Sequence, residues 1–151
     1  MRIIVDANIV FSAILNTNSK IADLLLNSKG TFDFLAPDYL QTELRKYHSK
    51  ISMISKMSIK EIEIVEYKTT RPIKFMSGIH IPSTKWIQAE NLVKDVDDKD
   101  IPYVAFSLFY KCRIWSGDKV LRKGLEKKGF KNIISTEELF KLREDKSKSK
   151  K

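Results

Sequence analysis

Short apolar runs alternate along the chain with longer segments in which apolar residues recur every three or four positions. The run RIIVDA at residues 2–7 is β-branched and apolar up to its aspartate, which is typical of a strand buried on both faces of a sheet. Further strands are predicted at residues 31–37, 112–117 and 131–135. Helical spacing predicts helices at residues 8–15, 19–30, 37–57, 58–70, 85–95, 100–111, 118–129 and 135–144. Strands that alternate with helices indicate a three-layer α/β/α fold with a mainly parallel central sheet.

Two segments carry weaker patterns. Residues 58–70 are predicted as a helix, although their alternation of isoleucine and glutamate also fits a strand. The following segment, residues 71–85, is predicted to be irregular because proline and glycine interrupt it. No repeat or linker divides the chain, so we expect one domain over residues 1–143, followed by a basic, disordered tail at residues 144–151.

The stretch DVDDKDIPYVAFSL at residues 95–108 places four aspartates within six positions, directly before an apolar helical run. One or two of them would suffice to cap the helix and to oppose its dipole. Four acids in such a short stretch repel one another, so they are either solvated or gathered around a positive charge. A bound metal ion is the more specific of these interpretations.

The composition limits what kind of metal site and compartment to expect. A hydrophobic fraction of 42% and a charged fraction of 31% describe an ordinary soluble protein. No apolar run approaches the ~20 residues of a membrane span, and the N-terminus lacks the features of a signal peptide. With one cysteine, Cys112, and two distant histidines, a metal must rely on carboxylates, and a reducing cytoplasm is the expected compartment.

The chain is strongly basic. Its formal net charge is +9, and its calculated isoelectric point is about 9.6. Such a balance favours a polyanionic partner, of which nucleic acid is the commonest, and no membrane is expected. Solubility alone would also account for the charge.

Four carboxylates lie at predicted element boundaries that could meet at one edge of the sheet. Asp6 ends the first strand, Asp118 follows the strand at residues 112–117, and Asp100 begins the buried helix. Glu43 lies about two turns into the helix that starts near Pro37. In parallel sheets, ligands bind at the carboxyl ends of the strands where the strand order reverses. We therefore expect these acids to lie at one site there.

Each of these acids also has a structural interpretation. Asp6 could be a turn residue, although an acid at the end of a buried strand is costly unless it is used. Asp118 and Asp100 could be helix caps, and Glu43 could be a solvated helix residue. His48 and His80 are interpreted as surface or packing residues.

Clustered carboxylates in a basic protein suit phosphodiester hydrolysis with divalent metals. Carboxylate oxygens hold Mg²⁺ or Mn²⁺, which are hard cations. Such a metal lowers the pKa of a bound water and neutralises charge on the phosphate. An acidic metal site within a basic surface is the electrostatic pattern expected of a nuclease.

Four stretches in this order resemble the PIN-domain family of metal-dependent ribonucleases, whose members include the VapC-type toxins. The stretches are IIVDANIVFSAIL, APDYLQTELRKY, DVDDKDIPYVAFSL and CRIWSGDKVLRKGL. Together they run from the first residues to beyond residue 130, so the resemblance covers essentially the whole chain. It implies a PIN-like fold and an endoribonuclease that uses Mg²⁺ or Mn²⁺.

The resemblance also implies roles for individual residues. The residues expected to ligate metal and carry catalysis are Asp6, Glu43, Asp100 and Asp118, with Asp97 as an accessory ligand. Asn8 and Ser116 would orient ligands or phosphate. The acidic run is denser than the family pattern requires, which leaves the choice among Asp97, Asp98 and Asp100 open.

Further implications concern partners. The resemblance suggests RNA as the substrate, a cognate antitoxin protein and a homodimer. An RNA-processing nuclease without an antitoxin fits equally well, and an RNA-binding scaffold with a degenerate metal site is the alternative from another class. A phosphoryl-accepting receiver domain is disfavoured, because Asp6 is followed by Ala7 and Asn8 rather than by a second acid.

Overall fold

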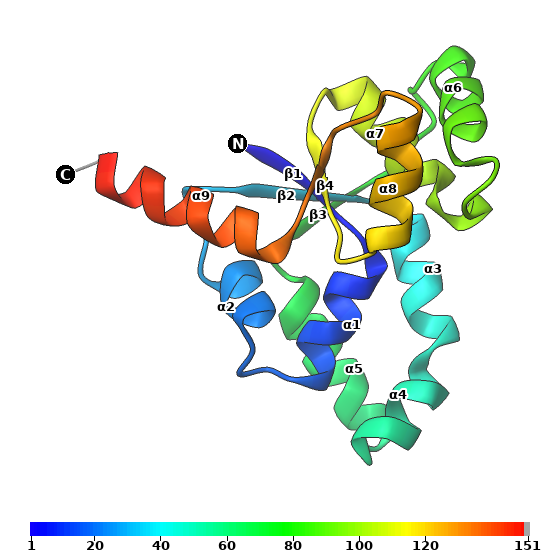
Figure 1. The fold of residues 1–151 in the computed structure, drawn as a ribbon. Coiled ribbons are helices and arrows are strands. Elements are labelled where there is room, and N and C mark those ends of the chain that lie inside the picture. Colours follow the sequence, from blue (N-terminus) through cyan, green and yellow to red (C-terminus); the bar gives the residue numbers. More distant parts are fainter. Residues whose placement is uncertain (150–151) are drawn as a thin grey trace.

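The computed structural model describes residues 1–149 and places a five-stranded sheet between layers of helices (Figure 1). The strands are β1 (Arg2–Val5), β2 (Asp33–Pro37), β3 (Ile73–Met76), β4 (Arg113–Trp115) and β5 (Ile133–Ile134). Their order is β3-β2-β1-β4-β5, and every neighbouring pair is parallel. The predicted α/β class with a parallel central sheet is therefore confirmed.

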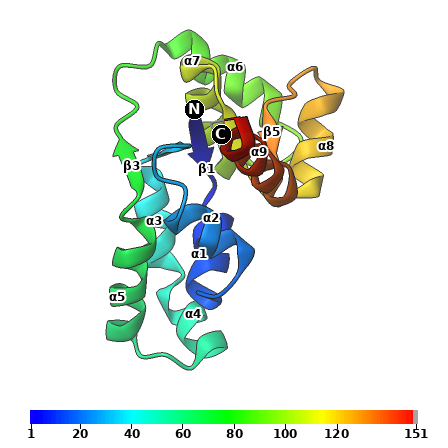
Figure 2. The same ribbon diagram turned by 90° about the vertical axis from the view of Figure 1, so that its left-hand side faces the viewer.

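Helices cover both sides of the sheet (Figures 1 and 2). They are α1 (Ala7–Leu15), α2 (Lys20–Leu26), α3 (Tyr39–Lys46), α4 (His48–Ser55), α5 (Ile59–Thr70), α6 (Ser83–Val93), α7 (Ile101–Tyr110), α8 (Lys119–Lys127) and α9 (Thr136–Ser149), with a 3-10 turn, η1 (Asp98–Asp100). Helix α7 lies on one face against β1, β2 and β4, and α6 packs on its outer side. On the opposite side α1 packs against both α2 and α5.

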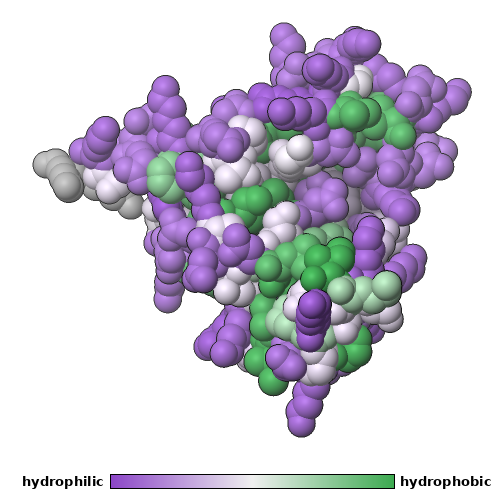
Figure 3. Space-filling model, turned by 60° about the horizontal axis from the view of Figure 1, so that its bottom comes forward, coloured by the Kyte–Doolittle hydropathy of each residue, from purple (hydrophilic) through white to green (hydrophobic). Residues whose placement is uncertain are grey.

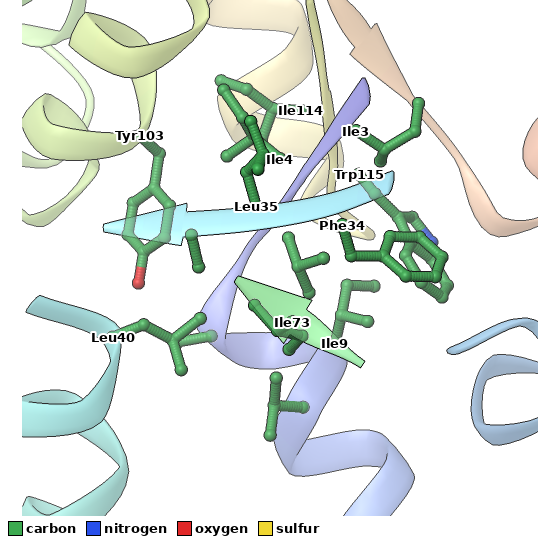
Figure 4. Packing of buried hydrophobic residues seen from close by; sticks show 14 of the residues in the cluster. Ile3, Ile4, Ile9, Phe34, Leu35, Leu40, Ile73, Tyr103, Ile114 and Trp115 are labelled. Atoms are coloured by element: carbon green, nitrogen blue, oxygen red, sulfur yellow. The ribbon is translucent and has the colours of Figure 1, made fainter. Parts of the chain in front are cut away.

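The core is built around β1, whose position at the centre of the sheet explains its uninterrupted apolar run. Ile3, Ile4 and Val5 are each completely buried. Figure 4 shows apolar side chains from the strands meeting those of α1, α3 and α7, including Ile9 and Leu40. Full burial of one such aliphatic side chain stabilises the fold by ~1.5–3 kcal/mol.

The helix predicted at residues 58–70, where the alternation also fitted a strand, is confirmed as α5. A reciprocal pair of hydrogen bonds starts this helix: the Glu61 backbone N–H donates to Ser58 Oγ at 3.1 Å, and the Ser58 backbone N–H donates to Glu61 Oε1 at 3.3 Å. Such a capping box satisfies two backbone donors that would otherwise lack partners. Ile62 is buried while Ile64 is half exposed, so the isoleucines do not share one face as strand alternation would require.

Two predictions about the elements were wrong. The helix expected over residues 37–57 is broken at Tyr47, whose φ of −103° and ψ of 6° end α3 and precede α4. No proline or glycine marks this break; instead the Tyr47 ring packs edge-on against Phe11, with centroids 5.0 Å apart. The segment at residues 71–85, expected to be irregular, contains β3 and the start of α6.

The tail expected to be disordered from residue 144 is helical as far as Ser149, and residues 150–151 lie outside the described part. The tail is rich in lysine, which is a good helix former, and its charge obscured this propensity. Arg143 ties α9 to α2, because its Nη2 donates to Asp23 Oδ2 at 2.7 Å. The extent of a single domain over residues 1–143 stays a prediction.

Within residues 1–149, no single helix is long and apolar enough to cross a membrane. The α1–α2 pair, bent by 111°, would match such a span in combined length and composition only.

Candidate active site

The strand order reverses between β1 and β4. From β1 the chain continues outward through β2 and β3, and then returns to the other side of β1 to form β4 and β5. At such a switch point the two following loops diverge and leave a crevice at the carboxyl ends of the strands. Asp6 directly follows β1, and Ser116 and Asp118 follow β4, so the predicted residues lie at this crevice.

A pocket of about 370 Å³ occupies the crevice, and we call it the acidic pocket. The carboxylates that line it are Asp6, Glu43, Asp97, Asp100 and Asp118. Asn8 lines it as well. The structure thus brings together all five acids that the sequence singled out, although they come from four separate segments of the chain.

Asp6 is the most deeply placed of these acids, with 6% of its surface exposed. It occupies the N-cap position of α1 but makes no side-chain capping bond, so its carboxylate is free to face the pocket. Ser116 Oγ donates to Asp6 Oδ2 at 2.8 Å. Burial raises the pKa of Asp6, and the hydrogen bond from Ser116 opposes that rise.

Ser116 joins the two strand ends. While its hydroxyl donates to Asp6, its oxygen accepts the Asp118 backbone N–H at 3.1 Å. Asp118 Oδ1 in turn accepts the Leu121 backbone N–H at 3.0 Å and caps α8. The cap interpretation of Asp118 therefore holds, and the same carboxylate also lines the acidic pocket, while its role as a metal ligand stays a prediction.

Glu43 is not the solvated helix residue that its sequence context allowed. It is 8% exposed on α3, and its Oε1 accepts the Tyr103 hydroxyl at 2.6 Å. Burial raises the pKa of Glu43, and the hydrogen bond from Tyr103 lowers it in part. Burial and the donation to Glu43 both raise the pKa of Tyr103, which keeps the phenol protonated.

The four clustered aspartates divide into two pairs. Asp97 and Asp100 line the acidic pocket, whereas Asp95 and Asp98 are exposed and do not line it. Burial, followed by the negative charges of Asp6 and the other pocket acids, raises the pKa of Asp100 to about 7. Which of Asp97, Asp98 and Asp100 would ligate a metal stays a prediction.

Sequence reasoning missed several side chains of the pocket. Tyr103 was one polar group in an apolar helix, yet it lies three residues after Asp100 and so shares its face of α7. Lys99 and Lys50 bring positive charge to the pocket, and Lys99 Nζ lies 3.4 Å from the Tyr47 hydroxyl. Their positions depend on how α3, α4 and η1 converge, which no local pattern encodes.

An apolar wall continues from the acidic pocket along α1 and α4. It consists of Phe11, Leu15, Ile51 and Ile54, of which Leu15 is 40% and Ile54 60% exposed. The two histidines lie elsewhere, as expected: His48 pairs with Glu66, and His80 Nε2 lies 2.7 Å from the Tyr110 hydroxyl.

The donor chemistry of the acidic pocket fits a hard divalent cation, because it offers carboxylate oxygens without sulfur or imidazole. As they stand, no three or more acidic, histidine or cysteine side chains among residues 1–149 are arranged to hold a metal ion. Four pocket carboxylates instead accept hydrogen bonds, from the hydroxyls of Ser116 and Tyr103 and from the backbone N–H groups of Lys99 and Leu121. Metal binding would therefore require their oxygens to turn toward a common point.

A parallel α/β sheet with carboxylates gathered at its switch point defines a class of fold that includes metal-dependent nucleases. The model of the PIN domain family matches residues 4–139, and the chain belongs to this family. This match confirms the resemblance seen in the four sequence motifs. PIN domains are generally nucleases.

The fold is similar to the crystal structure of VapBC2 from Rickettsia felis bound to a DNA fragment from its promoter. The TM-score is 0.68 at 10% sequence identity, and the match covers 89% of this chain and 97% of that chain. At this identity the likeness concerns the fold alone. No curated protein matches the chain in sequence.

Proposed function

We propose that the chain is a metal-dependent endoribonuclease that hydrolyses RNA phosphodiester bonds. The observation that carries this proposal is the convergence of five acids in one pocket of a protein with a net charge of +9. Burial and the neighbouring negative charges raise the pKa values of Asp6, Glu43 and Asp100, so gathering these acids costs free energy. A functional site that neutralises them offsets that cost.

Asp6, Glu43, Asp100 and Asp118, with Asp97, would hold Mg²⁺ or Mn²⁺ in this pocket. When bound, such a cation supplies an activated water and neutralises charge on the phosphate. Ser116 would fix the orientation of Asp6, and Tyr103 that of Glu43, because each donates a hydrogen bond to one carboxylate oxygen. Lys99 and Lys50 would bind phosphate oxygens at the pocket, and Asn8 would orient a ligand or phosphate.

Asp100 acts as the pocket acid that must ionise before a cation is held. Because its pKa is about 7, the protonated and the ionised forms of this carboxyl are both populated near neutral pH. Because metal ligation requires the deprotonated form, the affinity for metal rises as the pH rises.

We also propose a cognate antitoxin as protein partner, a homodimer as the assembly and the cytoplasm as the location. The apolar wall beside the acidic pocket supports a protein partner. Figure 3 shows hydrophobic surface on the side of the molecule that carries α4, where Met53 is 83% and Ile54 60% exposed. Exposed apolar patches of this kind mark interaction sites. The structural neighbour, moreover, is a VapBC2 complex.

The test is cleavage of a panel of end-labelled RNAs with Mg²⁺ or Mn²⁺, with and without EDTA. We expect metal-dependent cutting, and a loss of at least ~100-fold for Asp100→Asn. Asp98→Asn is the matched control, because Asp98 neighbours Asp100 in sequence but is exposed and outside the pocket. Equal cutting by both variants would contradict the proposal.

Two alternative hypotheses make different predictions. A scaffold with a degenerate metal site would bind RNA but cut none of the panel. An RNA-processing nuclease without an antitoxin would cut RNA, and its expression alone would not arrest growth.

A further inference from the structure

A second and larger hollow, of about 870 Å³, opens at the opposite end of the sheet from the acidic pocket. It lies where β1, β2 and β3 begin, beside the end of α5 and the loop between α2 and β2. We call it the basic hollow. β1 separates the two sites, because Arg2 begins this strand at the hollow and Asp6 follows it at the pocket. Four residues of extended strand span about 13 Å.

The basic hollow carries a strong excess of positive charge. Its charged lining residues are Arg2, Lys29, Lys68, Arg71, Lys74 and one acid, Asp33. All five basic side chains are exposed. Within the part of the chain that the structure describes, none of them forms an ion pair. Five cations around one concavity repel one another, so an anionic ligand would stabilise this arrangement.

The floor of the hollow is apolar. Phe32, Phe34 and Leu35 line it and are nearly buried, and Leu26 lines it with 43% of its surface exposed. A cationic rim around an apolar floor matches a ligand that carries both phosphates and flat, weakly polar groups. Nucleic acid strands combine these two features in every nucleotide.

The helix ends at the hollow favour a strand over a single small anion. Helix α2 ends at Leu26 and α5 ends at Thr70, so both present their C-terminal ends on this side. A helix C-terminus carries free carbonyls and partial negative charge, which disfavours a closely held phosphate. The attraction therefore comes from long, exposed side chains, which suit a flexible polyanion.

We propose that the basic hollow binds the phosphodiester backbone of the RNA that the acidic pocket cleaves, as a second contact remote from the scissile bond. This inference rests on the proposed ribonuclease function. An RNA of a few nucleotides reaches one site only, whereas a longer strand runs over the surface and occupies both. The second contact raises the effective concentration of the strand at the acidic pocket.

The first test is binding of a labelled 20-nucleotide RNA in EDTA, followed by fluorescence anisotropy over a range of salt concentrations. We expect the combined variant Lys68→Gln, Arg71→Gln and Lys74→Gln to bind about tenfold more weakly than the wild type. The slope of log K against log salt should become shallower by about 2, since each phosphate contact on a single strand contributes about 0.7.

The matched control is the combined variant Lys123→Gln, Lys127→Gln and Lys131→Gln. These lysines are exposed and unpaired within residues 1–149, and α8 lies across the molecule from β3 (Figure 2). Both variants lose three charges, so general electrostatic attraction falls equally. An equal loss of affinity in both would overturn the proposal, as would displacement of the RNA by inorganic tripolyphosphate at comparable concentration, which indicates a small-anion site.

The second test compares cleavage of 20-nucleotide and 5-nucleotide RNAs. The combined variant of Lys68, Arg71 and Lys74, called the hollow variant, should have an about tenfold higher KM for the long RNA and an unchanged kcat. Its KM and kcat for the short RNA should equal those of the wild type. An equal KM for the long RNA in variant and wild type would contradict the inference while leaving the nuclease intact. Conversely, the wild type could bind RNA without cutting it, while the hollow variant alone loses this binding. That result would support RNA binding at the basic hollow and refute the nuclease function. Matching thermal melts establish that each variant is folded.

Discussion

The two ends of the parallel sheet collect opposite charges in opposite ways. At the carboxyl end, five acids lie in a pocket where Asp6 and Glu43 are buried and held by hydrogen bonds. At the amino end, five cations lie around a larger hollow, and all are exposed. Burying a carboxylate costs free energy unless partners compensate, whereas a solvated lysine or arginine costs little. The buried and fixed charges therefore indicate chemistry, and the exposed ones indicate attraction of a ligand.

The largest effect is expected when a buried acid loses its charge. Asp6→Asn should reduce metal-dependent RNA cleavage by more than ~100-fold, because it removes a deeply placed oxygen donor. The same change relieves repulsion with Asp118 and Asp100, so the metal-free protein should be at least as stable as the wild type. Cleavage rates and thermal melts measure the two outcomes. An Asp6→Asn protein that cuts at the wild-type rate would remove the pocket from the chemistry.

A smaller effect is expected from the residue that links the two strand ends. Ser116→Ala removes the donor to Asp6 and the acceptor of the Asp118 N–H. We expect cleavage to fall by ~10–100-fold and the free energy of unfolding to fall by about 1–2 kcal/mol. Ser12→Ala on α1 is the control, since Ser12 is exposed. If the two variants behave alike in denaturant titrations and cleavage assays, Ser116 does not position Asp6.

Tyr103→Phe tests the hydrogen bond to Glu43 without changing the shape of the core. Loss of this donor should raise the pKa of Glu43, because the bond from Tyr103 lowers it. The acidic limb of the pH–rate profile should therefore move to higher pH, and cleavage at pH 6 should fall by up to about tenfold. At pH 9 the variant should approach the wild type. If the cleavage rate instead falls by the same factor at every pH, the hydroxyl does not act by keeping Glu43 ionised.

The smallest effect concerns stability and pH. Because the pKa of Asp100 is raised from 3.8 to about 7, the folded protein binds more protons than the unfolded chain between these values. The free energy of unfolding without metal should therefore fall as the pH rises through this window. Mg²⁺ or Mn²⁺ should raise the melting temperature by a few degrees more at pH 8 than at pH 5.5. Asp100→Asn should flatten this dependence, and an unchanged pH profile in that variant would exclude Asp100 as its source.

Part of the acidic pocket was predictable because Asp6 and Asp118 follow strands that local sequence reveals, and the family resemblance supplied Glu43, Asp97 and Asp100. The run of isoleucines before Asp6 predicted a central strand, and the rule for parallel sheets then placed Asp6 and Asp118 together. By contrast, β3 is only four residues long and owes its conformation to pairing with β2, in which Phe34 aligns with Ile73. Pro72 and Gly78 flank this segment and predicted irregular structure, whereas the other edge strand, β5, was predicted from its own apolar residues.

Features that depend on convergence escaped prediction altogether. Tyr103 contacts Glu43 across 60 positions of sequence, and nothing local to either residue signals the other. The cations of the basic hollow are likewise scattered from Arg2 to Lys74, with no charge run to mark them. Their proximity results from parallel strands that begin at the same edge of the sheet. The net charge predicted a polyanionic partner, and the fold shows where positive charge concentrates.

The most direct test of the central claim is isothermal titration of Mn²⁺ into the metal-free protein at pH 8, compared with Asp100→Asn and Asp98→Asn. This measurement does not depend on knowing the RNA target. The account predicts saturable Mn²⁺ binding in the wild type and in Asp98→Asn, and binding at least tenfold weaker in Asp100→Asn. Wild-type affinity in Asp100→Asn, or no saturable binding in any of the three, would contradict a metal site in the acidic pocket.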